Sequence, residues 1–145
     1  MKKQVFYVLV TVLALASISG CAGLNKGPSD EEIISGKVAI FKQALLEKNL
    51  EKLMTVASEK FDHPDVGGKA EAKQFLQLGI DSGYTDGGEV DISKIQIKIE
   101  KDTATVYPIE VSSSAGSATA GLTFTKEKVG NGTDWLVTTV EVEGV

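Results

Sequence analysis

The chain has 145 residues, of which 15 are basic, 20 are acidic and one is cysteine, and its formal net charge is −5. Its length suits a single domain, and 42% apolar with 24% charged residues indicate a globular chain rather than a disordered one. One cysteine excludes an internal disulfide and a cysteine-rich zinc or iron–sulfur site. Every basic residue is Lys. We expect no nucleic-acid partner, because an acidic chain without arginine is poorly suited to neutralise phosphates.

The N-terminus has the parts of a secretory signal peptide. Lys2 and Lys3 precede an apolar run of 14 residues, 5–18, and two small residues then lead to Cys21. The run is too short for a permanent membrane-spanning helix, which needs about 20 residues. The sequence therefore predicts a cleaved leader rather than a membrane span.

The segment Ile18-Ser19-Gly20-Cys21 resembles the bacterial lipobox, in which an aliphatic residue and two small residues precede a cysteine. In that family the cysteine thiol receives diacylglycerol, the leader is cut before the cysteine, and the new amine is usually acylated. The resemblance implies a leader over 1–20, an acylated Cys21 with a tether over 21–28, and a folded domain over 29–145. The alternative is an ordinary signal peptide with an incidental cysteine.

The expected location is the bacterial cell envelope, with the membrane as partner through acylated Cys21. After removal of Lys2 and Lys3, 13 Lys and 20 acidic residues leave a net charge of −7. Anionic lipid repels such a surface, so anchoring would come from two or three acyl chains. Ala22, rather than Asp, follows the cysteine, and in enteric-type lipoproteins this implies the outer membrane, facing the periplasm.

Three helices are predicted after the tether. Ser29 and Glu32 form a capping box at the start of the first, which continues with apolar residues at helical spacing. Asn49 caps a second, shorter helix. A third runs over about residues 69–81 and stops at Gly83, since glycine adopts the left-handed conformation that ends many helices.

The apolar period changes from helical to alternating after Gly88. Four strands are predicted, over residues 95–99, 103–112, 118–127 and 135–142. Pro108 lies inside the second of these, which predicts an edge position or a bulge there. Helices followed by an antiparallel meander predict an α+β fold, with three N-terminal helices packed on one face of a curved antiparallel sheet.

Four segments of this pattern are specific: Phe41–Leu45, Asn49–Met54, Gly68–Ala72 and Asp134–Val137, the last with the only tryptophan. They resemble the NTF2-like superfamily, which includes SnoaL-type cyclases and ketosteroid isomerases. The resemblance covers about residues 30–143 and implies a cone with a pocket between the helices and the concave sheet face. This superfamily hosts enzymes, ligand binders and dimerising adaptors, so the fold alone does not give the function.

Asp62 and His63 are candidate acid–base groups. They match the segment between the second and third helices, where several members of the superfamily place inward-facing polar groups, and either could act as a general base on an apolar substrate. The alternative is structural, because residues 61–65 also form a polar, proline-containing turn. One histidine cannot build a His-based metal site, and we expect no metal and no cofactor.

Aromatic residues could line the pocket, although core packing is the simpler explanation for most of them. The pocket candidates are Phe61, His63, Phe75, Tyr107 and Trp135. Tyr107 and Trp135 carry polar groups and are the preferred residues for its mouth. Phe75 shares the apolar side of the third predicted helix with Leu76 and Ile80.

Three functions follow as expectations. The first is a lipid-anchored envelope protein whose domain binds a small apolar ligand or an envelope partner without catalysis. The second is a small SnoaL-like enzyme that uses Asp62 and His63. The third is a dimerising structural module. A ligand binder requires an open apolar cavity, whereas a homodimeric module predicts a small or filled one.

Overall fold

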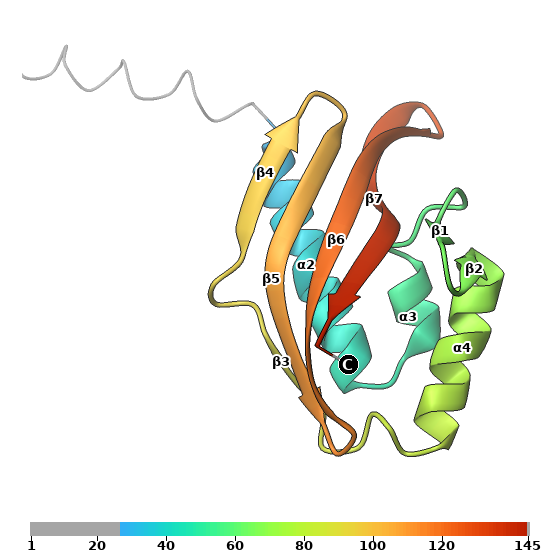
Figure 1. Ribbon diagram of the computed structural model, residues 1–145. Coiled ribbons are helices and arrows are strands. Elements are labelled where there is room, and N and C mark those ends of the chain that lie inside the picture. Colours follow the sequence, from blue (N-terminus) through green and yellow to red (C-terminus); the bar gives the residue numbers. More distant parts are fainter. Residues whose placement is uncertain (1–26, 145) are drawn as a thin grey trace, which may run out of the picture.

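The computed structural model describes residues 27–144, so the predicted leader, Cys21 and most of the tether lie outside the described residues. Three helices come first and a five-stranded antiparallel sheet follows (Figure 1). The helices are α2 (Asp30–Leu46), α3 (Leu50–Met54) and α4 (Lys69–Asp81). The sheet contains β3 (Glu89–Asp91), β4 (Gln96–Glu100), β5 (Thr103–Ser113), β6 (Gly116–Val129) and β7 (Gly132–Glu143).

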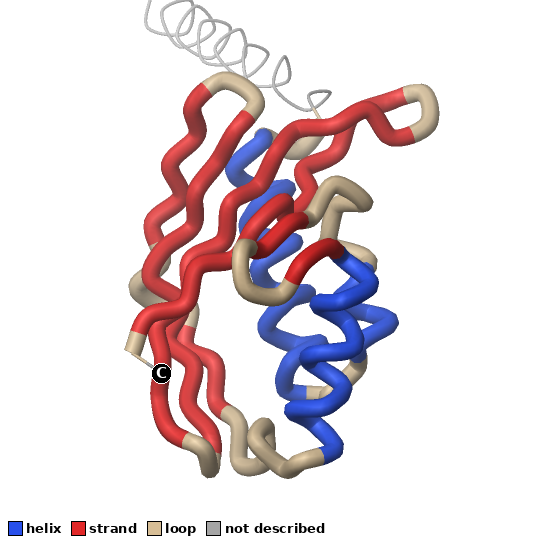
Figure 2. Tube along the Cα trace, turned by 45° about the vertical axis from the view of Figure 1, so that its right-hand side comes forward, coloured by secondary structure: helices blue, strands red, loops and turns tan. Residues whose placement is uncertain are grey.

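The sheet has the strand order β3-β5-β6-β7, and β4 pairs with β5 along the same side as β3. The three helices lie on one face of this curved sheet (Figures 1 and 2). A separate hairpin of β1 (Asp62–His63) and β2 (Gly67–Gly68) lies between α3 and α4 in the sequence. The predicted α+β architecture is confirmed.

The helix ends follow the local chemistry that the sequence indicates. Ser29 Oγ accepts the Glu32 N–H at 3.2 Å and the Glu32 carboxylate accepts the Ser29 N–H at 2.7 Å, which is the predicted capping box. Asn49 Oδ1 accepts the Lys52 N–H at the start of α3. Gly83 follows α4 with φ of 77°, a conformation that glycine adopts without a steric cost. All three predicted helices are confirmed.

The predicted strands are confirmed in position. Three of them extend beyond their predicted ends, whereas β4 is shifted by one residue, from the predicted 95–99 to Gln96–Glu100. The pairing of β5 with β6 is irregular between Val106 and Ile109, so Pro108 sits in a bulge and its missing N–H breaks no ladder. The alternative of an edge strand is wrong, because β5 lies inside the sheet with β6 on one side and β3 and β4 on the other. Strand β3 and the hairpin of β1 and β2 were not predicted, since two or three residues are too few to show an alternating pattern.

The core lies between α2 and the inner face of the sheet. Trp135 and Phe124 are its largest fully buried side chains, and Ile34 and Val38 of α2 pack against them. A smaller cluster of Ala44, Leu50 and Leu53 joins α2 to α3, with Leu76 and Ile80 of α4 against it. No side chain of α4 is fully buried, so this helix is the outermost layer of the domain.

Candidate functional site

An apolar pit opens between the helices and β7, in the place where a cone of this shape would hold a ligand. Its volume is about 60 Å³. It is lined by Phe41, Leu53, Met54, Val56, Ala57, Phe61, Lys69, Ala72, Leu76, Val137 and Val140. Ligand sites for drug-sized molecules are typically about 300–1,000 Å³, so the pit accommodates an apolar side chain and not a steroid-sized compound.

The only charged residue in the lining is turned toward neighbouring polar groups. Lys69 Nζ donates to the Ala57 carbonyl oxygen at 3.1 Å and to Glu59 Oε1 at 2.5 Å. With its ammonium group bound in this way, Lys69 leaves the surface of the pit apolar. The pit therefore offers hydrophobic contact and no evident acid, base or nucleophile.

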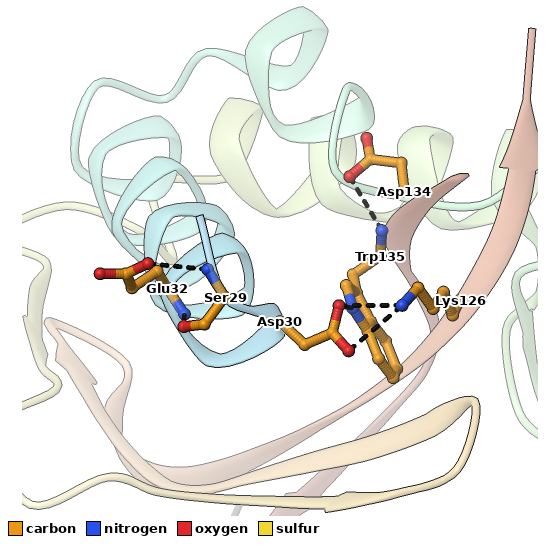
Figure 3. Close-up of polar contacts among 6 residues, drawn as sticks. All are labelled: Ser29, Asp30, Glu32, Lys126, Asp134 and Trp135. Carbon is orange, nitrogen blue, oxygen red and sulfur yellow. Dashed lines mark hydrogen bonds and ion pairs between the residues drawn. The ribbon is translucent and has the colours of Figure 1, made fainter. Parts of the chain in front are cut away.

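Two aromatic residues fill the interior of the cone. Trp135 and Phe124 are both 0% exposed in the core cluster that includes Ile34 and Val38 of α2, so close packing leaves no room for a ligand around their rings. The indole Nε1 donates to Asp30 Oδ1 at 2.9 Å (Figure 3). The polar indole N–H of Trp135 led us to expect this residue at the mouth of the pocket. It lies in the core instead, because Asp30 accepts the hydrogen bond of that N–H within the domain.

A polar cluster around Trp135 ties the first turn of α2 to the sheet. Lys126 Nζ also donates to both carboxylate oxygens of Asp30, at 3.0 Å to Oδ1 and 3.2 Å to Oδ2. The hydrogen bond from Trp135, followed by that from Lys126, holds the pKa of Asp30 below its ordinary value of 3.8. Beside it, Asp134 accepts the Trp135 backbone N–H at 2.8 Å (Figure 3). Asp134 also pairs with Lys37 at 2.6 Å.

The candidate acid–base residues lie outside the lining of the pit. Asp62 is exposed and His63 is half-buried, both in the hairpin of β1 and β2. His63 Nδ1 accepts the Asp65 N–H at 3.1 Å, a local turn contact. The backbone oxygen of Asp62 accepts Thr139 Oγ1 at 2.8 Å, which fastens the hairpin to β7.

The predicted pocket residues are not brought together. Phe61 lines the pit. Phe75 is 63% exposed on α4, and Tyr107 is 48% exposed on the outer face of the sheet. Phe75 does not share the packed side of α4 with Leu76 and Ile80, since the spacing of Ala72, Leu76 and Ile80 alone defines that side.

Sequence reasoning missed the contribution of β7 to the pit. Val137 and Val140 both face the pit although they are three residues apart, because the pairing of β6 with β7 shifts register between them. Strict alternation would place these two valines on opposite faces. No local sequence signal marks this bulge.

Two further properties bear on chemistry and location. Among residues 27–144, no group of three or more His, Cys, Asp or Glu side chains is placed to hold a metal ion. Within the same residues, no helix has the length and apolar character needed to cross a bilayer.

Sequence comparison and structural comparison give different results for this chain. A scan against protein-family models finds no match. A search of curated proteins finds none either. Solved structures do match, among them a protein of unknown function with a cystatin-like fold from Nostoc punctiforme PCC 73102, with 21% identity, a TM-score of 0.61 and coverage of 77% of this chain and 87% of that one.

Two more solved structures have a similar backbone. An NTF2-like protein of unknown function from Pseudomonas putida KT2440 has 11% identity and a TM-score of 0.65, over 82% of this chain and 90% of that one. A candidate ketosteroid isomerase from Shewanella frigidimarina NCIMB 400 has 17% identity and a TM-score of 0.62, over 79% and 98%. At such identities the likeness shows the fold alone. The chain has an α+β NTF2-like fold, with three helices against a curved antiparallel sheet.

Proposed function

We propose that the chain is a lipid-anchored cell-envelope protein whose NTF2-like domain binds a protein partner without catalysis. The observation that carries this proposal is the filled interior of the cone, which disfavours a small ligand. Trp135 and Phe124 are fully buried there, and the remaining pit has a volume of about 60 Å³. An engineered apolar cavity of about 150 Å³ binds benzene, and this pit has less than half that volume, which disfavours a free aromatic ligand. The dimerising module shares this filled interior, and the oligomeric state separates it from the proposal.

The alternative of a SnoaL-like enzyme has weaker support from the geometry. An acid–base residue must lie within hydrogen-bonding reach of the substrate. Asp62 and His63 lie outside the lining of the pit, and the lining itself holds Lys69 as its only ionisable side chain. The likeness to a candidate ketosteroid isomerase concerns the backbone at 17% identity and carries no catalytic residue to this chain.

The anchoring part of the proposal rests on the sequence. Cys21 ends a lipobox-like segment, and seven residues separate it from Ser29, where the folded domain begins. Acylated Cys21 would hold α2 by its first turn close to the membrane, facing the periplasm if the outer membrane is the destination. The variant Cys21→Ser lacks the thiol, so we expect it to lose both lipid labelling and leader cleavage. Normal labelling of this variant would contradict the anchor.

Native mass spectrometry tests whether the domain carries a small ligand. The protein extracted from its own envelope is weighed under native and under denaturing conditions. Covalent acyl groups contribute to both masses, so a non-covalent ligand appears as a difference between them. We expect equal masses. A discrete additional mass that is lost on denaturation would contradict the protein-binding proposal in favour of a ligand binder, and a native mass of two chains would favour the dimerising module.

A further inference from the structure

The outer edge of β7 is only partly covered. At Val137 the segment around Ala57 forms a parallel bridge, with the Ser58 N–H donating to the Val137 oxygen and the Val137 N–H to the Val56 oxygen, both at 2.8 Å. Two residues further on, Thr139 Oγ1 binds the Asp62 carbonyl. From Val140 to Glu143, no described strand pairs with β7 on this side. A row of free backbone donors and acceptors therefore remains there.

The uncovered part of the edge lies beside the apolar pit. Val140 lines the pit with Ala72 and Leu76 of α4 on the opposite wall. Val142, the next residue on the inner face, pairs with Ala120 and is 50% exposed. A strand added to β7 would place alternate side chains over the pit and over Val142.

The other face of the same edge is acidic. Glu141 and Glu143 alternate with the two valines, and both are exposed. Glu143 also lines a groove of about 430 Å³ on the sheet with Glu89, Asp91 and Glu110, and no lysine contributes to that lining. An added strand would therefore bring its remaining side chains next to carboxylates.

We propose that the edge of β7 from Val140 to Glu143 accepts an extended segment of a partner protein in which apolar residues alternate with Lys or Arg. This inference rests on the proposed protein-binding function and names the surface and the chemistry of the partner. Main-chain hydrogen bonds to the free edge supply affinity. An apolar side chain enters the pit, and a basic side chain faces Glu141 and Glu143, which selects the register.

A second copy of this chain fits the same edge poorly. Antiparallel pairing of two β7 edges would bring Glu141 and Glu143 of both copies into one row of like charges, which is destabilising. A membrane surface of anionic lipid is repelled for the same reason. The charge pattern thus favours a basic partner over these two occupants.

Binding of short labelled peptides tests the proposal on the full chain in nanodiscs of zwitterionic lipid. One peptide alternates Lys and Val, a second alternates Glu and Val, and a third has the composition of the first with its lysines and valines in separate blocks. The double variant Glu141→Lys/Glu143→Lys reverses the charge of the edge. Glu31→Lys/Asp102→Lys is the matched control, since these acidic residues are also exposed but lie in the first turn of α2 and beside Lys126, away from β7 residues 140–143.

The unchanged chain should bind the alternating Lys peptide, with slowed amide exchange at residues 140–143. The edge variant should bind it roughly tenfold more weakly and gain affinity for the Glu peptide, whereas the control variant should behave as the unchanged chain. Filling the pit in Ala72→Leu should also weaken binding. Equal affinity for the alternating and the blocked peptides, or equal affinity in the edge variant, overturns the inference. Either result leaves the proposed function standing. That function is contradicted by other results, namely the additional mass of a non-covalent ligand or a native mass of two chains.

Discussion

A buried and an exposed phenylalanine give a matched test of the filled cone. Phe124 is 0% exposed between α2 and the inner face of the sheet, whereas Phe75 is 63% exposed on α4. Phe124→Ala should reduce the free energy of unfolding by about 3–5 kcal/mol, from lost burial and from the cavity left behind. Phe75→Ala deletes the same atoms at the surface and should change the free energy of unfolding by less than about 0.5 kcal/mol.

Urea unfolding of the domain measures the difference. For small domains the free energy falls by about 1–3 kcal/mol per molar urea, so Phe124→Ala should lower the midpoint by about 2 M. The single tryptophan, Trp135, is fully buried beside the mutated site and reports unfolding by its fluorescence, with circular dichroism as a second probe. Similar midpoints for Phe124→Ala and Phe75→Ala would refute the packed interior on which the proposed function depends.

Three further predictions concern single groups. Because the pKa of Asp30 is lowered in the folded state, ionised Asp30 stabilises the fold at pH values above its ordinary pKa of 3.8, and this contribution is lost as the pH falls through the lower folded pKa. Asp30→Asn should therefore flatten the decline of Tm on acidification between these two pKa values. An unchanged decline would contradict the role of Trp135 and Lys126. Ser29→Ala removes half of the capping box and should cost about 1 kcal/mol in urea unfolding, unlike the conservative Ser29→Thr. His63→Ala should leave the urea midpoint nearly unchanged, because the hydrogen bond that His63 Nδ1 accepts from the Asp65 N–H is local to the turn. A loss of several kcal/mol would show a wider structural role.

Helix ends were predictable from the sequence because capping is local chemistry. The Ser29 and Glu32 pair begins α2 as predicted, and α4 occupies residues 69–81 as its period indicates. The side of α4 that packs was harder to predict. Phe75 is apolar and one residue from Leu76, yet only Leu76 faces the domain, since the helix rests on the core along a narrow stripe.

The candidate site depends on tertiary geometry that no sequence pattern encodes. Trp135 has a polar ring atom, which favours an interface position, but Asp30 comes from 105 residues away to satisfy it inside the domain. The bulge in β7 that turns both Val137 and Val140 toward the pit is equally hidden from the sequence, because no residue type between the two valines marks an extra residue in the strand. Filling of the pocket therefore could not be predicted, although its position could.

The proposed anchor and the proposed binding edge lie at opposite ends of the sheet. Asp30, in the first turn after the tether, contacts Lys126 of β6, whereas Glu143 pairs with Thr119 of the same strand. Lys126 lies seven positions after Thr119, which at about 3.3 Å per residue places them about 23 Å apart. If acylated Cys21 holds the chain at the α2 end, the free edge of β7 points away from the lipid. Because the ion pairs of Asp30 and Lys37 fix α2 to the sheet, an anchor at the α2 end would attach the domain at the end of the sheet opposite the binding edge.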